Sequence, residues 1–386
     1  MIKRLRVKNY RSLADIDVTL EPLTVLVGHN GSGKSNLVDV LRFSQDAMRL
    51  GLDAAIVNRH GMSALRRWSD KGRPYDVEIS LTIHTDEIAG QYGFILGSER
   101  RGQYRIKREL CMLTPRGDTL GTVDFEANNG EWVRKPPGLA PPIEDNTLVL
   151  PRIAQTEPYR YLYNFLAGMS FYNIFPNSLT EPQKPANPYP LDEHGTNLAS
   201  TLRELQRTKS QQLPELEKSI NAVLPDVIDF QVNQVGGYLV TKLRHKISDQ
   251  SRALFELSQE SDGTLRMLGI LAALFQDPPR TLLALEEPEL TIHPGALRLL
   301  WEEIETASER TQVILTTHSP DLLDMCKAES LRIVEKSEGI TYIGPIEETQ
   351  KQAIQERLFA PGELLRAQGL RRERQGELAF ENGDTQ

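Results

Sequence analysis

The sequence predicts an α/β protein in which a parallel sheet is interrupted by a long insertion. Near the N-terminus an apolar strand, LTVLVG, is followed by a glycine-rich turn and by a segment, SNLVDVLRFSQDAMRL, with apolar residues at helical spacing. After Asp262 the same rhythm returns, with GTLRMLGILAALF and GALRLLWEEIETA as helices and TLLALEE and QVILTTH as strands. Because such alternation is typical of a parallel sheet covered by helices, the parts before about residue 85 and after about residue 255 are expected to form one domain.

Antiparallel strands are expected beside this core. RLRVKNYRSLADIDVTL at the N-terminus, DVEISLTIH from Asp76 and QYRIKRELCML from Gln103 all alternate apolar and polar residues. A period of two is typical of strands with one buried face. The sheet is therefore predicted to be mixed, with an antiparallel part added to the parallel core.

The insertion is predicted to be a compact, mainly helical lobe. Two proline-rich stretches, KPPGLAPPIED and EPQKPANPYP, mark loops or lobe boundaries. Between them, YRYLYNFLAGMSFYNIF is aromatic and is expected to be helical core, although interleaved aromatic residues are also compatible with base binding. The next segment predicts two helices around Pro214 and a hairpin that turns at Gly236 and Gly237.

The predicted organisation has four segments. Residues 1–85 hold the N-terminal part of the core, and residues 86–254 hold antiparallel strands and the inserted helical lobe. Residues 255–345 complete the core. Residues 346–386 are expected to form a C-terminal helix and a polar tail that is frayed from Arg371.

Composition is that of an ordinary globular protein. The 386 residues are 39% hydrophobic and 25% charged, with a formal net charge of -8. This charge argues against a broad polyanion-binding surface, but a local basic groove, or one formed on assembly, stays open. The N-terminus lacks the apolar core of a signal peptide and no apolar run reaches the ~18 residues of a membrane helix, so we expect a soluble cytoplasmic protein with no membrane partner. Cys111 and Cys326 are expected to be buried free thiols.

A phosphate-binding loop is the strongest motif. Residues 28–35 read GHNGSGKS and match G-x-x-x-x-G-K-S between a predicted strand and a predicted helix. The glycines allow successive backbone N–H groups to point at phosphate oxygens, and the helix N-terminus adds its positive end. Lys34 would pair with the β- and γ-phosphates of ATP, and the Ser35 hydroxyl would bind Mg²⁺. The predicted nucleotide-binding residues of this loop are Asn30, Gly31, Ser32, Gly33, Lys34, Ser35 and Asn36.

Acidic residues end the apolar strand of TLLALEEPE. A phosphate loop needs a second strand whose terminal acid holds the metal, and Glu286 occupies that position. Glu287 would point elsewhere and polarise the water that attacks the γ-phosphate. A surface acidic turn and a carboxylate-based nuclease site are the alternatives. Glu289 has no assigned role.

Two weaker elements follow in an order consistent with this site. Ser261-Asp262-Gly263-Thr264 opens an amphipathic helix, where Ser261 and Gly263 could donate hydrogen bonds to phosphate. A simple helix N-cap explains the same residues. His318 ends an apolar strand where a γ-phosphate sensor would lie, although a structural histidine is the alternative.

Together these motifs resemble the ABC-type ATPases of the RecF, SMC and OLD-like branch, and especially bacterial AAA-family ATPases with SDGT, EEPE and TTHSP motifs. The resemblance implies a P-loop NTPase of the ABC-ATPase type that hydrolyses ATP with Mg²⁺. It also implies a head-to-tail homodimer, or an assembly of such dimers, around two ATP molecules. Each site would then combine one subunit's Lys34, Ser35, Glu286, Glu287 and His318 with Ser261 and Gly263 of the other.

Some family features are altered. Glu286 replaces the usual aspartate, and ESDGT replaces the transporter-like LSGGQ. The glutamine that senses Mg²⁺ is not evident, with Gln155 as a candidate, and Arg11 of the KNYRSL turn is a candidate to approach nucleotide. His293 falls in the loop that contacts the second subunit in the family. No long heptad array is present, which excludes an SMC-type arm.

The function implied is that of an ATP-dependent switch controlling a partner such as a nuclease or toxin, in anti-phage defence or DNA repair. An OLD-like nuclease is the alternative, and nucleic acid stays open as a partner. The 68 residues from 319 to 386 are expected to be too few for the TOPRIM domain of that family. A P-loop kinase of a small metabolite does not fit the SDGT and TTHSP motifs in this order.

Overall fold

The computed structural model describes residues 1–68, 75–98, 103–117, 121–138 and 140–373. Its main sheet is built from β1 (Ile2–Tyr10), β2 (Leu13–Thr19), β3 (Leu23–Val27), β4 (Val77–His84), β5 (Ile88–Ser98), β6 (Tyr104–Pro115), β7 (Val123–Asn128), β8 (Glu131–Arg134), β9 (Met169–Tyr172), β13 (Leu282–Glu286), β14 (Gln312–Thr317), β15 (Leu331–Ser337) and β16 (Ile340–Pro345). Their order in space is β8-β7-β6-β5-β4-β1-β2-β16-β15-β3-β14-β13-β9. The first and last parts of the chain therefore meet in the middle of one sheet.

Five neighbouring strands, β15, β3, β14, β13 and β9, run parallel and form the parallel half of the sheet. Alternate residues of these strands enter two separate hydrophobic clusters. Leu26, Ala284 and Ile314 pack with helices α1 (Lys34–Arg49) and α5 (Tyr159–Ala167) on one face. The intervening strand residues pack with α9 (Asp262–Leu274) and α10 (Pro294–Ser308) on the other. Burial on both faces explains why these strands are continuously apolar in sequence.

The other half, from β8 to β2, is antiparallel. In β4 the residues Val77, Ile79, Leu81 and Ile83 are buried and alternate with half-buried ones, as expected for a strand with one core face. Strand β16 joins the two halves: it runs parallel to β2, with Thr341 opposite Leu13, and antiparallel to β15. The antiparallel addition predicted from the alternating segments is confirmed as part of the same sheet.

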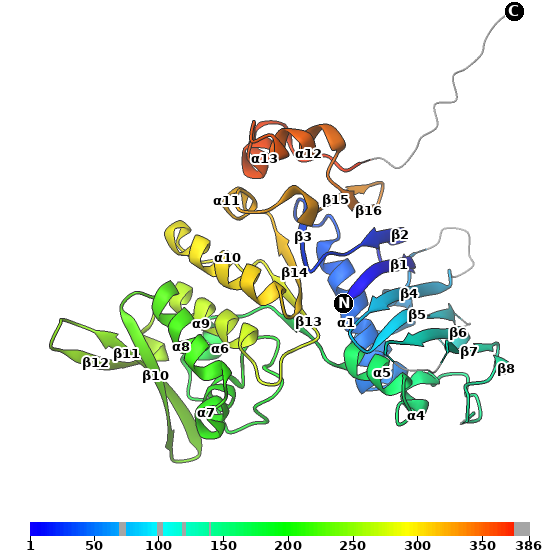
Figure 1. Ribbon diagram of the computed structural model, residues 1–386, viewed down its shortest axis with the longest axis horizontal. Coiled ribbons are helices and arrows are strands. Elements are labelled where there is room, and N and C mark those ends of the chain that lie inside the picture. Colours follow the sequence, from blue (N-terminus) through cyan, green and yellow to red (C-terminus); the bar gives the residue numbers. More distant parts are fainter. Residues whose placement is uncertain (69–74, 99–102, 118–120, 139, 374–386) are drawn as a thin grey trace, which may run out of the picture.

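A lobe extends from the parallel half. It contains α6 (Asn177–Thr180), α7 (Leu198–Thr208), α8 (Gln212–Val223) and a second sheet of β10 (Val227–Val235), β11 (Tyr238–Lys246) and β12 (Arg252–Glu256). In Figure 1 this lobe (green) lies at the end of the molecule opposite strands β4 to β8. The hairpin turn at Gly236 and Gly237 is confirmed between β10 and β11.

Two local predictions are wrong. The aromatic segment is helical only in α5, because Met169–Tyr172 forms strand β9 beside β13. The break between α7 and α8 falls at residues 209–211, and Pro214 lies in the first turn of α8, where no backbone N–H is needed. Strand β5 and the hairpin of β15 and β16 were not predicted.

The remaining elements are short or C-terminal. They are α2 (Leu52–Val57), α3 (Met62–Leu65), α4 (Leu150–Ile153), α11 (Pro320–Leu323), α12 (Glu348–Gln355), α13 (Pro361–Gln368) and the 3₁₀ turns η2 (Leu257–Gln259) and η3 (Ala328–Ser330). The C-terminal region thus has two helices rather than one, and residues 374–386 of the predicted tail lie outside the described residues. Cys111 and Cys326 are buried and free. Among the described residues no helix is long and apolar enough to span a membrane.

Candidate nucleotide-binding site

The predicted site residues of one subunit meet at the carboxyl edge of the parallel strands. Register places Glu286 of β13 beside Thr316 of β14, and Thr317 beside Val27 of β3. The residues that follow these strands are therefore neighbours. Ligands of open α/β sheets bind outside this edge, which is where the phosphate loop begins.

The loop is closed around its own lysine. Gly33 has a left-handed backbone (φ 109°) directly before α1, and a Cβ there would lie 2.2 Å from Thr341 Oγ1. Lys34 Nζ donates to the carbonyls of Gly28 at 2.7 Å and His29 at 3.2 Å. Burial lowers the pKa of Lys34, while the carboxylates of Glu287 and Glu289 oppose that shift. A cation held in a backbone cradle at a helix N-terminus is suited to bind phosphate.

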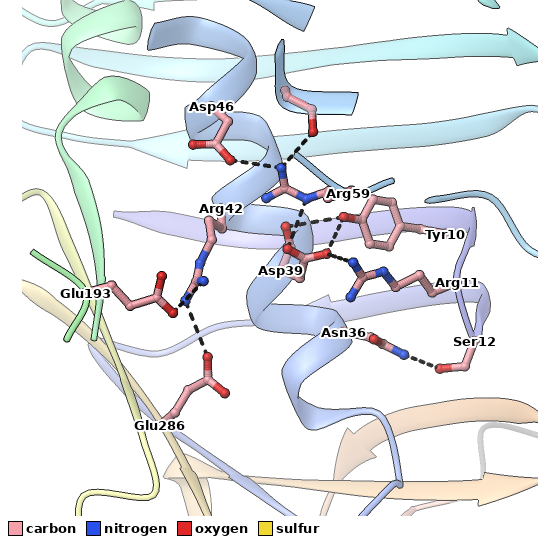
Figure 2. Close-up of polar contacts among 11 residues, drawn as sticks. Tyr10, Arg11, Ser12, Asn36, Asp39, Arg42, Asp46, Arg59, Glu193 and Glu286 are labelled. Atoms are coloured by element: carbon pink, nitrogen blue, oxygen red, sulfur yellow. Dashed lines mark hydrogen bonds and ion pairs between the residues drawn. The ribbon is translucent and has the colours of Figure 1, made fainter. Parts of the chain in front are cut away.

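The metal side of the site pairs a hydroxyl with a carboxylate. Ser35 Oγ donates to Glu286 Oε2 at 3.2 Å, and Arg42 Nη2 lies 3.4 Å from Glu286 Oε1. Arg42 also pairs with Glu193 at 2.7 Å, so it lies between the two acids (Figure 2). Burial raises the pKa of Glu286, and Arg42 and Ser35 oppose this. Hydroxyl and carboxylate oxygens are the ligands that Mg²⁺ prefers, so this donor set fits the ion.

Glu287 is held in an unusual conformation beside a histidine. Its backbone is left-handed (φ 44°), and its N–H donates to the Thr316 carbonyl at 3.0 Å and to Thr316 Oγ1 at 3.2 Å. Its Oε1 lies 3.3 Å from Nδ1 of His318, with 30% of the Glu287 side chain and 43% of the His318 side chain exposed. A partly exposed carboxylate oriented by a second group has the arrangement of a general base.

The KNYRSL turn is fixed to helix α1 (Figure 2). Asp39 accepts a hydrogen bond from Tyr10 at 2.6 Å and forms ion pairs with Arg11 at 3.1 Å and Arg59 at 3.0 Å. The guanidinium of Arg11 is therefore engaged with α1, and its predicted approach to nucleotide stays a prediction.

Ser12 and Thr341 connect the same turn to the phosphate loop. Asn36 donates to Ser12 Oγ at 2.7 Å, and Ser12 Oγ lies 2.7 Å from Thr341 Oγ1. Thr341 in turn donates to the carbonyl of Ser32 at 2.7 Å. Of the other loop residues, Asn30 and Gly31 are exposed. These contacts place hydroxyl groups behind the loop and leave its outer side open.

Ser261 and Gly263 are not part of the cluster around Lys34. Ser261 is exposed and caps α9, where its hydroxyl accepts from the N–H of Thr264 at 3.1 Å. Among the described residues no hydrogen bond joins Ser261 or Gly263 to the phosphate loop. The helix-cap interpretation is therefore confirmed within one chain, and a phosphate role would require another chain.

Other candidates lie elsewhere, and the structure adds residues that were not predicted. Gln155, the candidate for the glutamine that senses Mg²⁺, is exposed on the turn after α4. It does not follow a strand of the sheet, and the residue that directly follows β9 is Asn173. His293 caps α10 by accepting from the N–H of Gly295 at 3.1 Å. Of the residues found only in the structure, Arg42 could have been noticed because it lies seven residues after Ser35, on the same face of α1. No sequence signal identified Glu193, Thr341 or Arg266 as contacts of the site, the last of which donates from Nη2 to the Glu287 carbonyl at 3.0 Å.

Comparison with known proteins identifies the family. A family model described as "AAA domain, putative AbiEii toxin, Type IV TA system" matches residues 23–324. The chain belongs to this AAA family. It is an ATPase of the RecF, SMC and OLD type, consistent with the architecture and motifs above.

Curated relatives of this AAA ATPase include two nucleases. It is 24% identical over 375 residues to OLD nuclease of Thermus scotoductus (strain ATCC 700910 / SA-01), a match covering 92% of the chain and 66% of the relative. It is 22% identical over 368 residues to Old nuclease of Escherichia phage P2, covering 86% of the chain and 59% of the relative. The chain thus spans two thirds or less of the length of these nucleases. A 68-residue segment is 40% identical to the DNA replication and repair protein RecF of Arthrobacter sp. (strain FB24). This match covers 14% of the chain and 17% of the relative.

Solved structures show the same fold. An SMC head bound to the C-winged helix domain of ScpA aligns with a TM-score of 0.58 at 13% identity, covering 90% of this chain and 99% of that chain. An SMC head with an extended coiled coil from Pyrococcus furiosus aligns with a TM-score of 0.56 at 12% identity, covering 92% and 99%. At these identities the likeness establishes the fold alone.

Proposed function

We propose that this AAA ATPase is a molecular switch that closes as a head-to-tail homodimer around two ATP molecules and controls a partner protein. One observation carries the proposal. The phosphate loop, Glu286, Glu287 and His318 converge at one sheet edge, while among the described residues no hydrogen bond joins the exposed Ser261 at the N-terminus of α9 to that loop. A second subunit would supply that terminus to the first.

Each group in the site has a task in hydrolysis. Lys34 would leave the Gly28 and His29 carbonyls to pair with the β- and γ-phosphates, and the N–H groups of the loop would hold the same oxygens. Glu287 would accept a proton from the attacking water as its oxygen bonds to the γ-phosphorus and the bond to ADP breaks. His318, paired with Glu287, would orient this carboxylate. Mg²⁺ held by Ser35 and Glu286 would supply positive charge to the phosphate oxygens.

The dimer is tested with a substitution that separates binding from hydrolysis. Glu287→Gln should retain ATP binding, hydrolyse ATP at least about 100-fold more slowly and accumulate as an ATP-bound dimer. Turnover is measured by phosphate release, and the dimer by light scattering with and without ATP. Glu302→Gln, an exposed glutamate of α10, is the matched control. If Glu287→Gln hydrolysed ATP at the wild-type rate, Glu287 would not be the general base.

The trans contribution of α9 has its own test. Ser261→Arg places a bulky charge at the helix terminus and should abolish both turnover and ATP-dependent dimerisation. Ser251→Arg adds the same charge at another exposed position of the lobe and should change neither. Unchanged turnover and dimerisation in Ser261→Arg would contradict the sandwich dimer.

The partner is proposed to be an effector such as a nuclease or toxin, with a role in anti-phage defence or DNA repair. The family description names a toxin system, and the relatives are nucleases and a repair protein. The effector is sought by purifying the tagged Glu287→Gln chain with ATP and with ADP from cells that express the neighbouring genes. A nuclease or toxin retained only with ATP is the expected result, whereas its retention with both nucleotides would contradict an ATP-controlled contact.

Direct cleavage of nucleic acid is the second candidate, favoured by the names of the two nuclease relatives. It is distinguished by incubating the purified chain with plasmid DNA and Mg²⁺ or Mn²⁺. Metal-dependent cleavage that persists in Lys34→Ala would establish a nuclease site separate from the ATP site. No cleavage by the chain alone, with cleavage appearing only with a co-purified effector, is the result expected for a switch.

A further inference from the structure

Helix α9 contacts the segment of its own subunit that carries Glu286 and Glu287. A Cβ at Gly263 would lie 2.8 Å from the carbonyl oxygen of Thr291, so the first turn of α9 touches the segment after Glu287. One turn later, Arg266 Nη2 donates to the carbonyl of Glu287 at 3.0 Å and to that of Glu286 at 3.4 Å. The Arg266 side chain is buried, with 3% exposed. The helix that presents Ser261 is thereby joined to the residue that would activate water.

Glu289 makes a corresponding contact on the histidine side. This carboxylate is buried, with 9% exposed, and its Oε1 accepts from Thr317 Oγ1 at 2.6 Å. Thr317 Oγ1 also accepts from the N–H of Ser319 at 3.0 Å. Because Thr317 and Ser319 flank His318, this contact fixes the backbone on both sides of the histidine.

Both side chains retain a buried polar atom without a hydrogen bond. Among the described residues, neither Arg266 Nε nor Glu289 Oε2 has a partner. Burial lowers the pKa of Arg266, and the carboxylates of Glu289 and Glu287 oppose that shift. Leaving such groups unpaired destabilises the folded state, so stability alone does not account for these two side chains.

We infer that Arg266 and Glu289 are positioning residues that hold Glu287 and His318 in the geometry for hydrolysis. Arg266 stabilises the left-handed Glu287 backbone through its carbonyl, and Glu289 fixes the strand end that carries His318. A residue misplaced by 1 Å can cost about 100-fold in rate, so these indirect contacts are sufficient to control turnover.

A coupling between the two sites follows, and it rests on the proposed sandwich dimer. In that dimer, Ser261 of one subunit meets the nucleotide bound by its partner. If α9 moves when Ser261 meets the nucleotide of the partner, the contacts of Gly263 and Arg266 transmit this movement to Glu287 of the same subunit. ATP in one site therefore acts on the general base of the other site, and hydrolysis at the two sites is cooperative.

The positioning role is tested with Arg266→Lys and Arg266→Gln. The kcat should fall about 100-fold in Arg266→Gln and less in Arg266→Lys, which keeps the positive charge and can still donate to a carbonyl. The Kd for a fluorescent ATP analogue should stay within about twofold, because among the described residues no hydrogen bond joins Arg266 to the loop. The control is Arg332→Lys, since Arg332 is also buried and donates to backbone carbonyls, those of Thr19 and Glu329, outside the site. Wild-type kcat in both Arg266 variants, or an equal loss in Arg332→Lys, would overturn the inference.

Glu289 is tested through Thr317, which also covers the case that Arg266→Gln does not fold. Glu289→Ala and Thr317→Val remove opposite ends of one hydrogen bond, so each should lower kcat and the double variant should be no worse than the more impaired single variant. Circular dichroism melting identifies folded samples. Additive losses in kcat would show that the two residues act separately and would overturn the Glu289 assignment.

The coupling is tested by the ATP dependence of turnover. The wild-type Hill coefficient should exceed that of Arg266→Lys, which should approach about 1. An Arg266→Lys/Glu287→Gln double variant should still dimerise with ATP. Equal Hill coefficients would overturn the coupling, whereas a Glu287→Gln chain that stays monomeric with ATP would instead overturn the proposed dimer. Whichever of these results is obtained, the positioning role is tested separately by comparing the kcat of the wild type and of the Arg266 variants at saturating ATP.

Discussion

Two buried glutamates, Glu109 in the antiparallel half and Glu289 at the edge of the parallel half, are satisfied in different ways. Glu109 is 1% exposed, and both of its oxygens accept hydrogen bonds, Oε1 from Tyr92 and Leu150 at 3.0 Å each and Oε2 from Val149 at 2.6 Å. Glu289 has one bonded oxygen, and within the described residues its second oxygen has no partner.

The difference separates two uses of a buried charge. Glu109 ties strand β6 to the first turn of α4, so its contacts serve the folded state of one chain. Glu289 keeps an uncompensated oxygen near Arg266 and Lys34, where charges of the ligand and of the partner subunit would gather. The contacts of Glu109 therefore fit a structural role, and the place of Glu289 beside Arg266 and Lys34 fits a role in the site.

The largest expected effect is on ATP binding at the edge of the parallel half, where Glu289 lies near Lys34. Lys34→Ala removes the cation that would face the β- and γ-phosphates, at a cost of about 4 kcal/mol, or roughly 1,000-fold in Kd. The melting temperature without nucleotide should change little. Titration with a fluorescent ATP analogue and thermal unfolding measure the two quantities. A variant that binds ATP normally, or that unfolds, would break the assignment of this edge to ligand binding.

The next effect concerns stability in the antiparallel half. Glu109→Ala leaves the N–H groups of Val149 and Leu150 and the hydroxyl of Tyr92 without their acceptor, which should lower the free energy of unfolding by about 3 kcal/mol. Urea denaturation measures this loss, with the exposed Glu131→Ala as control. The kcat per folded molecule should be unchanged. A specific loss of turnover would show that Glu109 is not purely structural.

The dependence of stability on pH sharpens the same point. Burial raises the pKa of Glu109 from 4.5 to about 7, despite its three hydrogen-bond donors. The folded protein therefore keeps a proton that the unfolded chain releases. The stabilisation is complete below about pH 4.5 and is lost as the pH rises through about 7, amounting to roughly 3 kcal/mol. In urea denaturation between about pH 5 and pH 8, the free energy of unfolding of Glu109→Gln should not show this fall with rising pH. If the variant and the wild type showed the same fall, the pH dependence would come from other groups.

The smallest effect is expected behind the phosphate loop. Thr341→Val removes the hydroxyl that donates to Ser32 and contacts Ser12, at a cost of about 1 kcal/mol. The Kd for ATP should rise about fivefold with kcat nearly unchanged, because Glu287 and His318 are not disturbed. Ligand titration and steady-state turnover check this. A fall in kcat at constant Kd would place Thr341 in the chemistry rather than behind the loop.

The sequence allowed the parallel half to be predicted well because its strands are continuous apolar runs that end in polar motifs. The loop at 28–35 and the acids after β13 depend on local order, which a sequence contains. Strand β5 was missed because IAGQYGFILGS is rich in glycine, and β9 because four residues after an aromatic helix give no clear period. The pairing of Arg42 with Glu193 spans 151 positions, so no local pattern could indicate it.

The sheet order also determines when the loop could become functional during synthesis. Strand β3, which leads into the phosphate loop, lies between β14 and β15 and touches no other strand of the described sheet. Its hydrogen-bonding partners are thus made about 300 residues after β3 itself. At roughly 5–20 residues per second, the ribosome needs about 15–60 s to supply them. During that interval β3 lacks both of the strands with which it pairs in the folded sheet, so the sheet edge that holds the start of the loop can form only after β14 and β15 have been made.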